Sequence, residues 1–255
     1  MSTAGGGSSV LLQARGISKT FGHVEALSDV DFAVHEGEVV ALVGDNGAGK
    51  STLTKILCGA HRPDHGGLSM DGEEVAFRSP ADSRAAGIAV VYQDLALVDT
   101  RDVARNMFLG REPRRGIVLD RARMLRESRA TLDRLKIRIP SVRAPVSVLS
   151  GGQRQAVAIA RAIHQGGRLV IMDEPTAALG VHQQQNVLRL IEDLRAHGTA
   201  VVMVSHNLAH VFEVCTRIVV MRAGRIAGVR VTAETTPEEV VRLIVGAADF
   251  SVAGR

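Results

Sequence analysis

The sequence predicts an α/β fold, in which a mixed sheet with antiparallel strands near the N-terminus carries a helical subdomain inserted at about residues 94–164. Three observations predict it. Short apolar runs alternate with helical patterns, an order typical of a parallel sheet that is covered on both faces. The N-terminal third is rich in strand patterns, whereas residues 94–164 are arginine-rich with helical periodicity. A glycine-rich motif joins one of the apolar runs to one of the helical patterns.

The first third of the chain is expected to supply mainly strands, because its apolar residues alternate or form short runs. These strands are predicted at residues 10–17, 28–34, 39–43 and 67–75, the last being a hairpin that turns at Asp71-Gly72. Ser79-Pro80 then begins a short helix that ends near Gly87, since a capping hydroxyl precedes a proline at the first helical position.

The remainder of the chain is expected to alternate between strands and helices around the inserted segment. Further strands are predicted at residues 88–92, 169–172, 200–204 and 217–221, and the last of these begins a hairpin that ends at residue 231. Helices are predicted at residues 103–109, 120–135, 151–163, 181–196 and 208–214, and a last helix begins at Thr236-Pro237.

Bulk composition narrows the class of protein. Residues 1–9 are rich in glycine and serine and predict a flexible tail, followed by a single domain over residues 10–255. No apolar run approaches the roughly eighteen residues of a membrane-spanning helix. The net charge is +4, but the arginines are scattered and only 3% of residues are aromatic, so no nucleic-acid partner is expected. Cys58 and Cys215 stand singly in apolar segments and are expected to be buried, reduced thiols.

The strongest local signal is the octapeptide at residues 44–51, which fits the phosphate-binding pattern GxxxxGK[ST] and lies between an apolar strand and a helical pattern. Its glycines permit positive φ, so successive N–H groups can turn toward an anion at the start of the next helix. Lys50 is expected to reach the β- and γ-phosphates, and the Ser51 hydroxyl to hold Mg²⁺. The residues predicted to bind a nucleoside triphosphate here are Gly44, Asp45, Asn46, Gly47, Ala48, Gly49, Lys50, Ser51 and Thr52. A glycine-rich turn before an ordinary helix is the alternative.

Two adjacent carboxylates end the apolar strand at 169–172. A carboxylate at a strand end beside a phosphate loop can hold Mg²⁺ through its water shell, and the next residue can polarise an attacking water. We therefore assign Asp173 to the metal and Glu174 to the water. By themselves these residues would mark an ordinary boundary between a strand and a turn, and the phosphate loop upstream is what favours the catalytic interpretation.

A second possible anion site lies at residues 149–155, where Ser150, Gly151, Gly152 and Gln153 precede an apolar-periodic helix. A hydroxyl and free N–H groups at a helix N-terminus favour a bound anion. Taken alone, Ser150 would be an ordinary helix cap. A single triphosphate does not need two phosphate-binding sites from one chain. The site at residues 149–155 is therefore expected to bind a different nucleotide or to face the phosphate loop of a second subunit across a dimer.

Taken together, these motifs resemble the ATPase subunit of ATP-binding cassette (ABC) transporters over nearly the full chain. The family's motifs occur here in its usual order: the phosphate loop at 44–51, Gln93, the Leu-Ser-Gly-Gly-Gln signature at 149–153, Asp173-Glu174 and His206. Phe21 matches the aromatic residue that stacks on adenine. A GTPase is disfavoured because no NKxD guanine-reading motif is present. The resemblance implies the phosphate-loop NTPase fold of ABC ATPases, with ATP and Mg²⁺ as ligands.

The resemblance also implies a role for each matching residue. Gln93 is expected to sense Mg²⁺ and the attacking water and to couple the site to a membrane partner, and His206 to contact the γ-phosphate. Ser150 and Gly152 are expected to bind the γ-phosphate of the ATP held by the other subunit. Each has a plainer alternative: Phe21 as packing, and His206 as a structural residue. The histidine pairs His206/His210 and His61/His65 have metal-ligand spacing, but neither has a third ligand nearby in sequence.

Residues 92–110 and 173–181 are most similar to the importers of ribose, xylose and fructose, and the second segment to the single-cassette fructose branch. Gly180 is a departure, since most of the family has Asp there. The resemblance therefore implies an ATP-hydrolysing subunit of a bacterial importer, most simply a homodimer. It would bind transmembrane permease subunits at the cytoplasmic face of the membrane and act indirectly with an extracellular solute-binding protein. The alternatives are a soluble ABC ATPase that acts on the ribosome or DNA, and a nucleotide-binding regulatory subunit.

Overall fold

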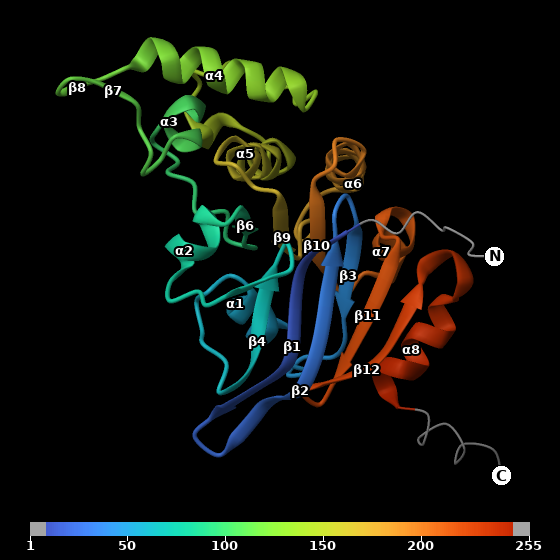
Figure 1. Ribbon diagram of the computed structural model, residues 1–255. Coiled ribbons are helices and arrows are strands. Elements are labelled where there is room, and N and C mark those ends of the chain that lie inside the picture. Colours follow the sequence, from blue (N-terminus) through green and yellow to red (C-terminus); the bar gives the residue numbers. More distant parts are fainter. Residues whose placement is uncertain (1–8, 247–255) are drawn as a thin grey trace, which may run out of the picture.

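The computed structural model describes residues 9–246, so most of the predicted tail at 1–9, and residues 247–255 of the predicted domain, lie outside the described residues. Two large sheets face each other around helix α1 (Lys50–Leu57), and further helices cover the other side of the larger sheet (Figure 1). The predicted α/β class with a mixed sheet is confirmed. Among residues 9–246, no helix combines the length and the apolar character that crossing a membrane requires.

The larger sheet has six strands in the order β12-β11-β3-β10-β9-β6. Five of them are parallel, and β12 pairs antiparallel with β11 at one edge. All residues of β3 and of β10 are buried, as expected for central strands that are covered on both faces. The strands are β3 (Val39–Val43), β6 (Ile88–Val91), β9 (Leu169–Asp173), β10 (Ala200–Val204), β11 (Arg217–Arg222) and β12 (Arg225–Val231).

The smaller sheet is antiparallel, in the order β2-β1-β4-β5. It contains β1 (Val10–Phe21), β2 (Val24–His35), β4 (His65–Met70) and β5 (Glu73–Val75). The first two strands are longer than the predicted 10–17 and 28–34, because their paired ends project beyond the core and lose the alternation that periodicity detects. The predicted turn at Asp71-Gly72 is confirmed, with φ of 53° and 83° at its two residues, as a tight two-residue hairpin requires.

The predicted helices are confirmed, with their ends shifted by up to two residues. They are α1, α2 (Pro80–Ala85), α3 (Val103–Met107), α4 (Arg121–Arg134), α5 (Gly151–His164), α6 (Val181–Ala196), α7 (Leu208–Val214) and α8 (Pro237–Val245). The sequence did not predict the small hairpin of β7 (Arg114–Arg115) and β8 (Val118–Leu119) within the inserted segment, nor the 3₁₀ turns η1 (Val146–Val148) and η2 (Thr232–Glu234). Strands this short leave no periodic signal. The subdomain boundaries at 94–164 remain a prediction.

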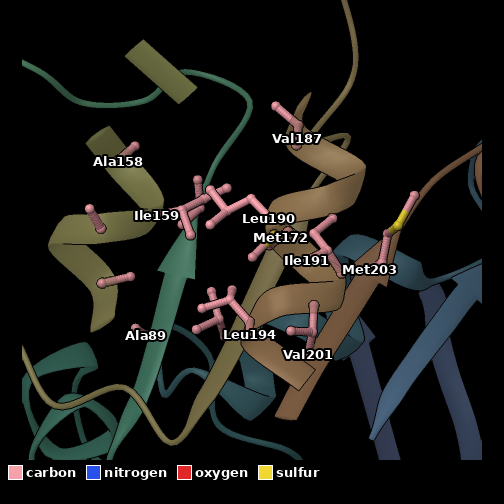
Figure 2. Packing of buried hydrophobic residues seen from close by; sticks show 14 of the residues in the cluster. Ala89, Ala158, Ile159, Met172, Val187, Leu190, Ile191, Leu194, Val201 and Met203 are labelled. Atoms are coloured by element: carbon pink, nitrogen blue, oxygen red, sulfur yellow. The ribbon is translucent and has the colours of Figure 1, made fainter. Parts of the chain in front are cut away.

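The larger sheet separates two hydrophobic clusters. Side chains that alternate along β3 and β10 enter opposite clusters: Leu42 and Val202 face α1 and the smaller sheet, whereas Val201 and Met203 face the other side. There α5 packs on β6 and α6 packs on β10, through residues such as Ile159, Leu190 and Ile191 (Figure 2). Both cysteines are buried and free, as predicted. Burial raises the pKa of the Cys215 thiol to about 12.

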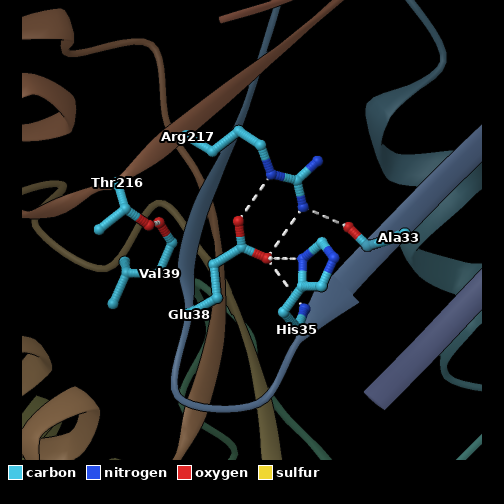
Figure 3. Close-up of polar contacts among 6 residues, drawn as sticks. All are labelled: Ala33, His35, Glu38, Val39, Thr216 and Arg217. Carbon is cyan, nitrogen blue, oxygen red and sulfur yellow. Dashed lines mark hydrogen bonds and ion pairs between the residues drawn. The ribbon is translucent and has the colours of Figure 1, made fainter. Parts of the chain in front are cut away.

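A polar cluster closes the amino end of the parallel strands (Figure 3). Glu38, just before β3, accepts from Nε and Nη2 of Arg217 at 2.6 and 2.9 Å and from the backbone N–H of His35 at 2.9 Å. Arg217 also donates to the carbonyl of Ala33 at 2.6 Å. Burial alone would raise the pKa of Glu38, but the hydrogen bonds and charge of Arg217, together with the bonds from His35, outweigh it and lower the pKa. The cluster joins β2, β3 and β11 and so holds the strand that leads to the phosphate loop.

Candidate functional site

The candidate site lies at the carboxyl ends of β3, β9 and β10, which are neighbours in the larger sheet. In sheets of this kind, loops at the carboxyl ends of the strands hold the ligand. The phosphate loop follows β3, Asp173 and Glu174 end β9, and His206 follows β10. The three motifs that are far apart in the sequence are therefore brought to one edge of the sheet.

The phosphate loop requires its glycines for two different reasons. A Cβ on Gly44 would lie 2.2 Å from the carbonyl oxygen of Met221, and one on Gly49 would lie 2.8 Å from Cδ2 of Leu27, so at both positions the loop packs too closely for a side chain. Gly47 has φ of 81°, but its Cβ position has no heavy atom within 4 Å. The loop is therefore packed against the protein on one side and open on the other.

Helix α1 starts at Lys50 and has no side-chain cap, since its N-cap is Gly49. The first amides of a helix lack intrahelical partners, so this open end can accept an anion. Lys50 Nζ donates to the carbonyls of Gly44 and Asp45 at 2.6 and 2.8 Å and so lies across the loop. Burial lowers the pKa of Lys50, while the carboxylates of Glu174, Asp45 and Asp173 act in the opposite direction.

The two adjacent carboxylates at the end of β9 have different surroundings. Burial raises the pKa of Asp173, and the neighbouring Glu174 charge adds to the effect, although Lys50 opposes it. Glu174 turns away with φ of 49°, and its backbone N–H donates to the carbonyl of Val204 at 2.9 Å. Its Oε1 lies 2.7 Å from Nδ1 of His206 and accepts from the backbone N–H of His206 at 3.1 Å. The charged form of Asp173 is therefore disfavoured, mainly because the side chain is buried.

The remaining residues predicted on this side are more exposed. Among residues 9–246, no hydrogen bond from Ser51 Oγ is found, so its hydroxyl is free to meet a ligand. Gln93 follows Tyr92 just beyond β6 and is exposed. The Phe21 ring, at the end of β1, is 44% exposed and lies edge-on to His61 with the ring centroids 5.3 Å apart. Lys19 Nζ lies over the ring at 5.5 Å from its centroid, so the ring is partly exposed beside a cation.

The signature residues lie elsewhere, at the start of α5, which in Figure 1 is grouped with α3 and α4. Ser150 Oγ accepts from the N–H of Gln153 at 3.3 Å, and Gln153 Oε1 accepts from the N–H of Ser150 at 3.1 Å, so the two form a capping box. A Cβ on Gly152 would lie 2.9 Å from Cβ of Gln183, which explains the glycine beside α6. Within the described part of the chain, no hydrogen bond joins residues 150–153 to the phosphate loop.

The structure therefore brings together Lys50, Asp173, Glu174 and His206, but it leaves the signature apart from them in one chain. Ser150, Gly152 and Gln153 instead line a cavity of about 730 Å³ beside α6. The side chain of Gln153, predicted to bind nucleotide, is engaged within the capping box and with the carbonyl of Arg138 at 3.2 Å. His206 and His210 point to different partners, since His210 Nδ1 lies 3.0 Å from Oγ1 of Thr176.

Sequence reasoning missed two residues that shape the loop after Gln93. Arg161 donates to the carbonyls of Leu95 and Ala96 at 2.7 and 2.8 Å. Asn106 is fully buried, and its amide group hydrogen bonds to the backbone N–H and C=O of Val98 at 2.7 and 3.0 Å. Asn106 lies in the segment 92–110 that resembles the sugar importers, but nothing in the sequence assigns it a role, and Arg161 lies outside the motifs. A buried asparagine could have been suspected only from its place among apolar residues.

The residues present fit a nucleoside triphosphate with Mg²⁺. The open side of the loop, the uncapped start of α1 and the lysine across it suit an anion. The raised pKa of Asp173 indicates a carboxylate that a nearby cation would favour in its charged form. Among the described residues no group of three or more His, Cys, Asp or Glu side chains could hold a metal by itself.

Comparison with known proteins gives a consistent result. A family model described as ABC transporter matches residues 27–177. The xylose/arabinose import ATP-binding protein of Sulfolobus acidocaldarius is 46% identical over 92% of this chain and 93% of its own length. The fructose import ATP-binding protein of Rhizobium meliloti is 47% identical over 93% of this chain and 94% of its own. A ribose import ATP-binding protein of Rubrobacter xylanophilus is 48% identical over 92% of this chain, but over 47% of its own length.

Solved structures show the same fold. The crystal structure of an ATP-binding cassette of an ABC transporter in its ADP conformation superposes with a TM-score of 0.80 at 24% identity, covering 93% of this chain and 96% of that one. A bacterial ABC transporter cassette solved as a dimer gives a TM-score of 0.72 at 24% identity, covering 87% and 99%. At these identities the likeness concerns the fold.

Proposed function

This chain belongs to the ABC transporter family of ATPases, and from that premise we propose that it hydrolyses ATP to drive import of a monosaccharide. The observation that carries the chemistry is the convergence of Lys50, Asp173, Glu174 and His206 at one edge of the sheet. The proposal that the solute is a monosaccharide is supported by the two relatives that match over nearly their whole length, which are import proteins for xylose/arabinose and for fructose.

In the proposed reaction each residue has a task that follows from its position. The phosphate loop amides and Lys50 hold the β- and γ-phosphates, and the partly exposed ring of Phe21 receives the adenine. Glu174 orients the attacking water, and His206 holds that carboxylate in place and approaches the γ-phosphate. Bound Mg²⁺, held by Ser51 and Asp173 with Gln93 nearby, would offset charge on the transferred phosphoryl group. Positioning and electrostatic stabilisation are the main contributions that phosphoryl transfer needs from a protein.

We further propose that two copies of the chain assemble head to tail, with two nucleotides between them. Support comes from the separation of residues 150–153 from the phosphate loop within one chain. In such a dimer, Ser150 and Gly152 of one copy complete the site formed by Lys50 and Glu174 of the other. Permease subunits would dock at the inserted segment beside Gln93, which places the dimer at the cytoplasmic face of the membrane.

Phosphate release by the purified protein tests the assignment of residues. Glu174→Gln should lower the hydrolysis rate by about 10²- to 10⁴-fold, because it removes the group that polarises water, while ATP binding persists and an ATP-loaded dimer accumulates on size-exclusion chromatography. Lys50→Ala should instead weaken ATP binding itself. Glu73→Gln, on the exposed hairpin strand β5, is the matched control and should hydrolyse normally. Wild-type turnover by Glu174→Gln would show that another group positions the water.

Mixing two inactive variants tests the shared site. Lys50→Ala and Ser150→Ala each damage a different half of it, so a mixed dimer should contain one pocket with both halves intact. Hydrolysis should return on mixing. Mixtures that stay inactive, while a strictly monomeric form hydrolyses ATP at the full rate, would contradict the proposed dimer. The sugar is identified separately by uptake of labelled xylose, fructose and ribose in cells with and without the chain.

A further inference from the structure

The loop that carries Gln93 is tied to the helix that begins at Ser150, and we propose that Arg161 is the positioning residue that lets the two nucleotide sites of the dimer influence each other. The inference rests on the proposed function, in which Gln93 serves the nucleotide of its own chain and Ser150 serves that of the partner. A rigid connection between them would join one site to the other.

Arg161 lies in α5, and both terminal nitrogens of its guanidinium donate hydrogen bonds to main-chain carbonyls. Nη2 donates to Leu95 at 2.7 Å and Nη1 to Ala96 at 2.8 Å. It is half-buried, and it forms no ion pair with a carboxylate among residues 9–246. Placing a charged group there without a countercharge is unfavourable unless its hydrogen bonds are satisfied. The two carbonyls accept the hydrogen bonds of the guanidinium and so offset the cost of burying it. The position of the loop and the burial of Arg161 therefore depend on each other.

The backbone that Arg161 holds has an uncommon conformation. Ala96 has φ of 47°, in the left-handed region that non-glycine residues rarely adopt. The carboxylate of Asp94 accepts from the N–H of Ala96 at 3.3 Å, and Leu95 packs against the large hydrophobic cluster. Such a conformation persists only where its surroundings hold it. The turn begins one residue after Gln93, so its shape determines where Gln93 projects.

A second connection runs through the backbone a few residues farther on. The N–H of Ser147 donates to the carbonyl of Asp99 at 3.1 Å, and the N–H of Val146 donates to that of Arg101 at 3.0 Å. Buried Asn106 binds the same loop from inside, through both backbone groups of Val98. Residues 146–149 lead directly into Ser150. The loop at 93–102 thus contacts α5 at Arg161 and also contacts the segment that precedes α5.

A displacement of Gln93, caused by its own nucleotide or by a permease, would therefore move the start of α5 with it. Because Ser150 faces the nucleotide of the partner in the proposed dimer, the change would alter the affinity of the second site. Coupling of this kind needs a contiguous set of contacts and a measurable interaction between sites. Arg161 is the α5 side chain that hydrogen-bonds to this loop among the described residues, and it can be changed without touching either nucleotide.

The experiment compares Arg161→Gln and Arg161→Lys with wild type in full-length protein, using Mg·ATP as the ligand. Arg129→Gln is the matched control, since this arginine is exposed on α4 and pairs with Asp133. Hydrolysis is followed against ATP concentration to obtain a Hill coefficient. Amide hydrogen exchange is measured on residues 94–98 and, as an internal reference, on β10.

The wild-type Hill coefficient should exceed unity. Arg161→Gln should bring it to unity, whereas Arg161→Lys should lower it by less, because one ammonium can still reach one of the two carbonyls. Exchange at residues 94–98 should become about tenfold faster while β10 keeps its protection, since local opening is independent of global unfolding. The inference is overturned if the wild type shows no cooperativity, if Arg161→Gln keeps it, or if exchange in β10 rises in parallel with the loop. A wild type that releases no phosphate would instead refute the proposed function.

Discussion

The two ends of strand β3 carry polar clusters of opposite character. At its amino end, Glu38 is surrounded by donors from Arg217 and His35, and its pKa is lowered. The phosphate loop, with its half-buried lysine, follows the carboxyl end of β3, close to Asp173 at the end of β9, and the pKa of Asp173 is raised mainly by burial and further by the neighbouring Glu174. The first cluster satisfies its charges within the protein. In the second, burial and a neighbouring carboxylate disfavour the charged form of Asp173, and a bound cation would offset that cost.

The comparison shows how one sheet can be stable at one end and reactive at the other. Hydrogen bonds to a carboxylate stabilise its charged form, whereas burial and like charges destabilise it. Groups with unfavourable environments cluster at functional sites, where bound ligand relieves them. Changes at the Glu38 end should therefore lower stability and leave the chemistry intact, while changes at the Asp173 end should impair the chemistry without lowering stability.

The largest expected effect is at Glu38. Glu38→Ala leaves Arg217 without its carboxylate partner in a mostly buried position, which should lower the free energy of unfolding by about 3 kcal/mol and the melting temperature by about 6 to 12 °C. The rate of hydrolysis per folded molecule should stay at the wild-type value, since the cluster lies at the opposite end of β3. Thermal unfolding and phosphate release below the transition measure the two quantities.

The pH dependence of that effect has a definite sign. Because folding lowers the pKa of Glu38 below its ordinary value of 4.5, the stabilisation is complete above that value and is lost as the pH falls through the folded-state pKa. Glu38→Gln should therefore lose less stability than the wild type on acidification from pH 4.5 downward. Parallel loss in both proteins would assign the acid sensitivity to other carboxylates.

Sequence reasoning predicted the part of this picture that depends on local patterns. The apolar runs located β3, β9 and β10, and the motif at residues 44–51 located the loop that follows β3. The Glu38 cluster was not predictable, because Arg217 lies 179 residues away in the sequence and neither residue belongs to a motif. The contacts of Arg161 were missed for a related reason: its partners are main-chain carbonyls, which every residue has, so the sequence contains no sign of them.

A smaller effect of opposite sign is expected at Asp173. Folding raises its pKa above the ordinary value of 3.8, so the charged carboxylate opposes folding, and stability falls as the pH rises through the raised pKa. Asp173→Asn should therefore stabilise the nucleotide-free protein near neutral pH, by about 1 kcal/mol for a site of this kind. Its response to Mg²⁺ in hydrolysis should be lost. Denaturant unfolding of the nucleotide-free protein checks the first statement, and phosphate release at increasing Mg²⁺ concentration checks the second. An unchanged or lower stability of Asp173→Asn would show that the charge on Asp173 does not oppose folding.

The smallest effect is expected at Gly180, which is at the N-cap of α6 and lies outside both clusters. It has φ of −68° and ψ of 156°, makes no side-chain cap, and its Cβ position has no heavy atom within 4 Å. Gly180→Asp should therefore be accepted without strain and should stabilise the fold by a few tenths of a kcal/mol as a helix cap. In the proposed dimer the new carboxylate would add an acceptor to a turn that is expected to face the partner, so the hydrolysis rate or the Hill coefficient should change. Gly180→Ala separates the two contributions, because it fills the same space without a carboxylate. If both variants keep the kinetics of the wild type, this turn takes no part in communication between the sites.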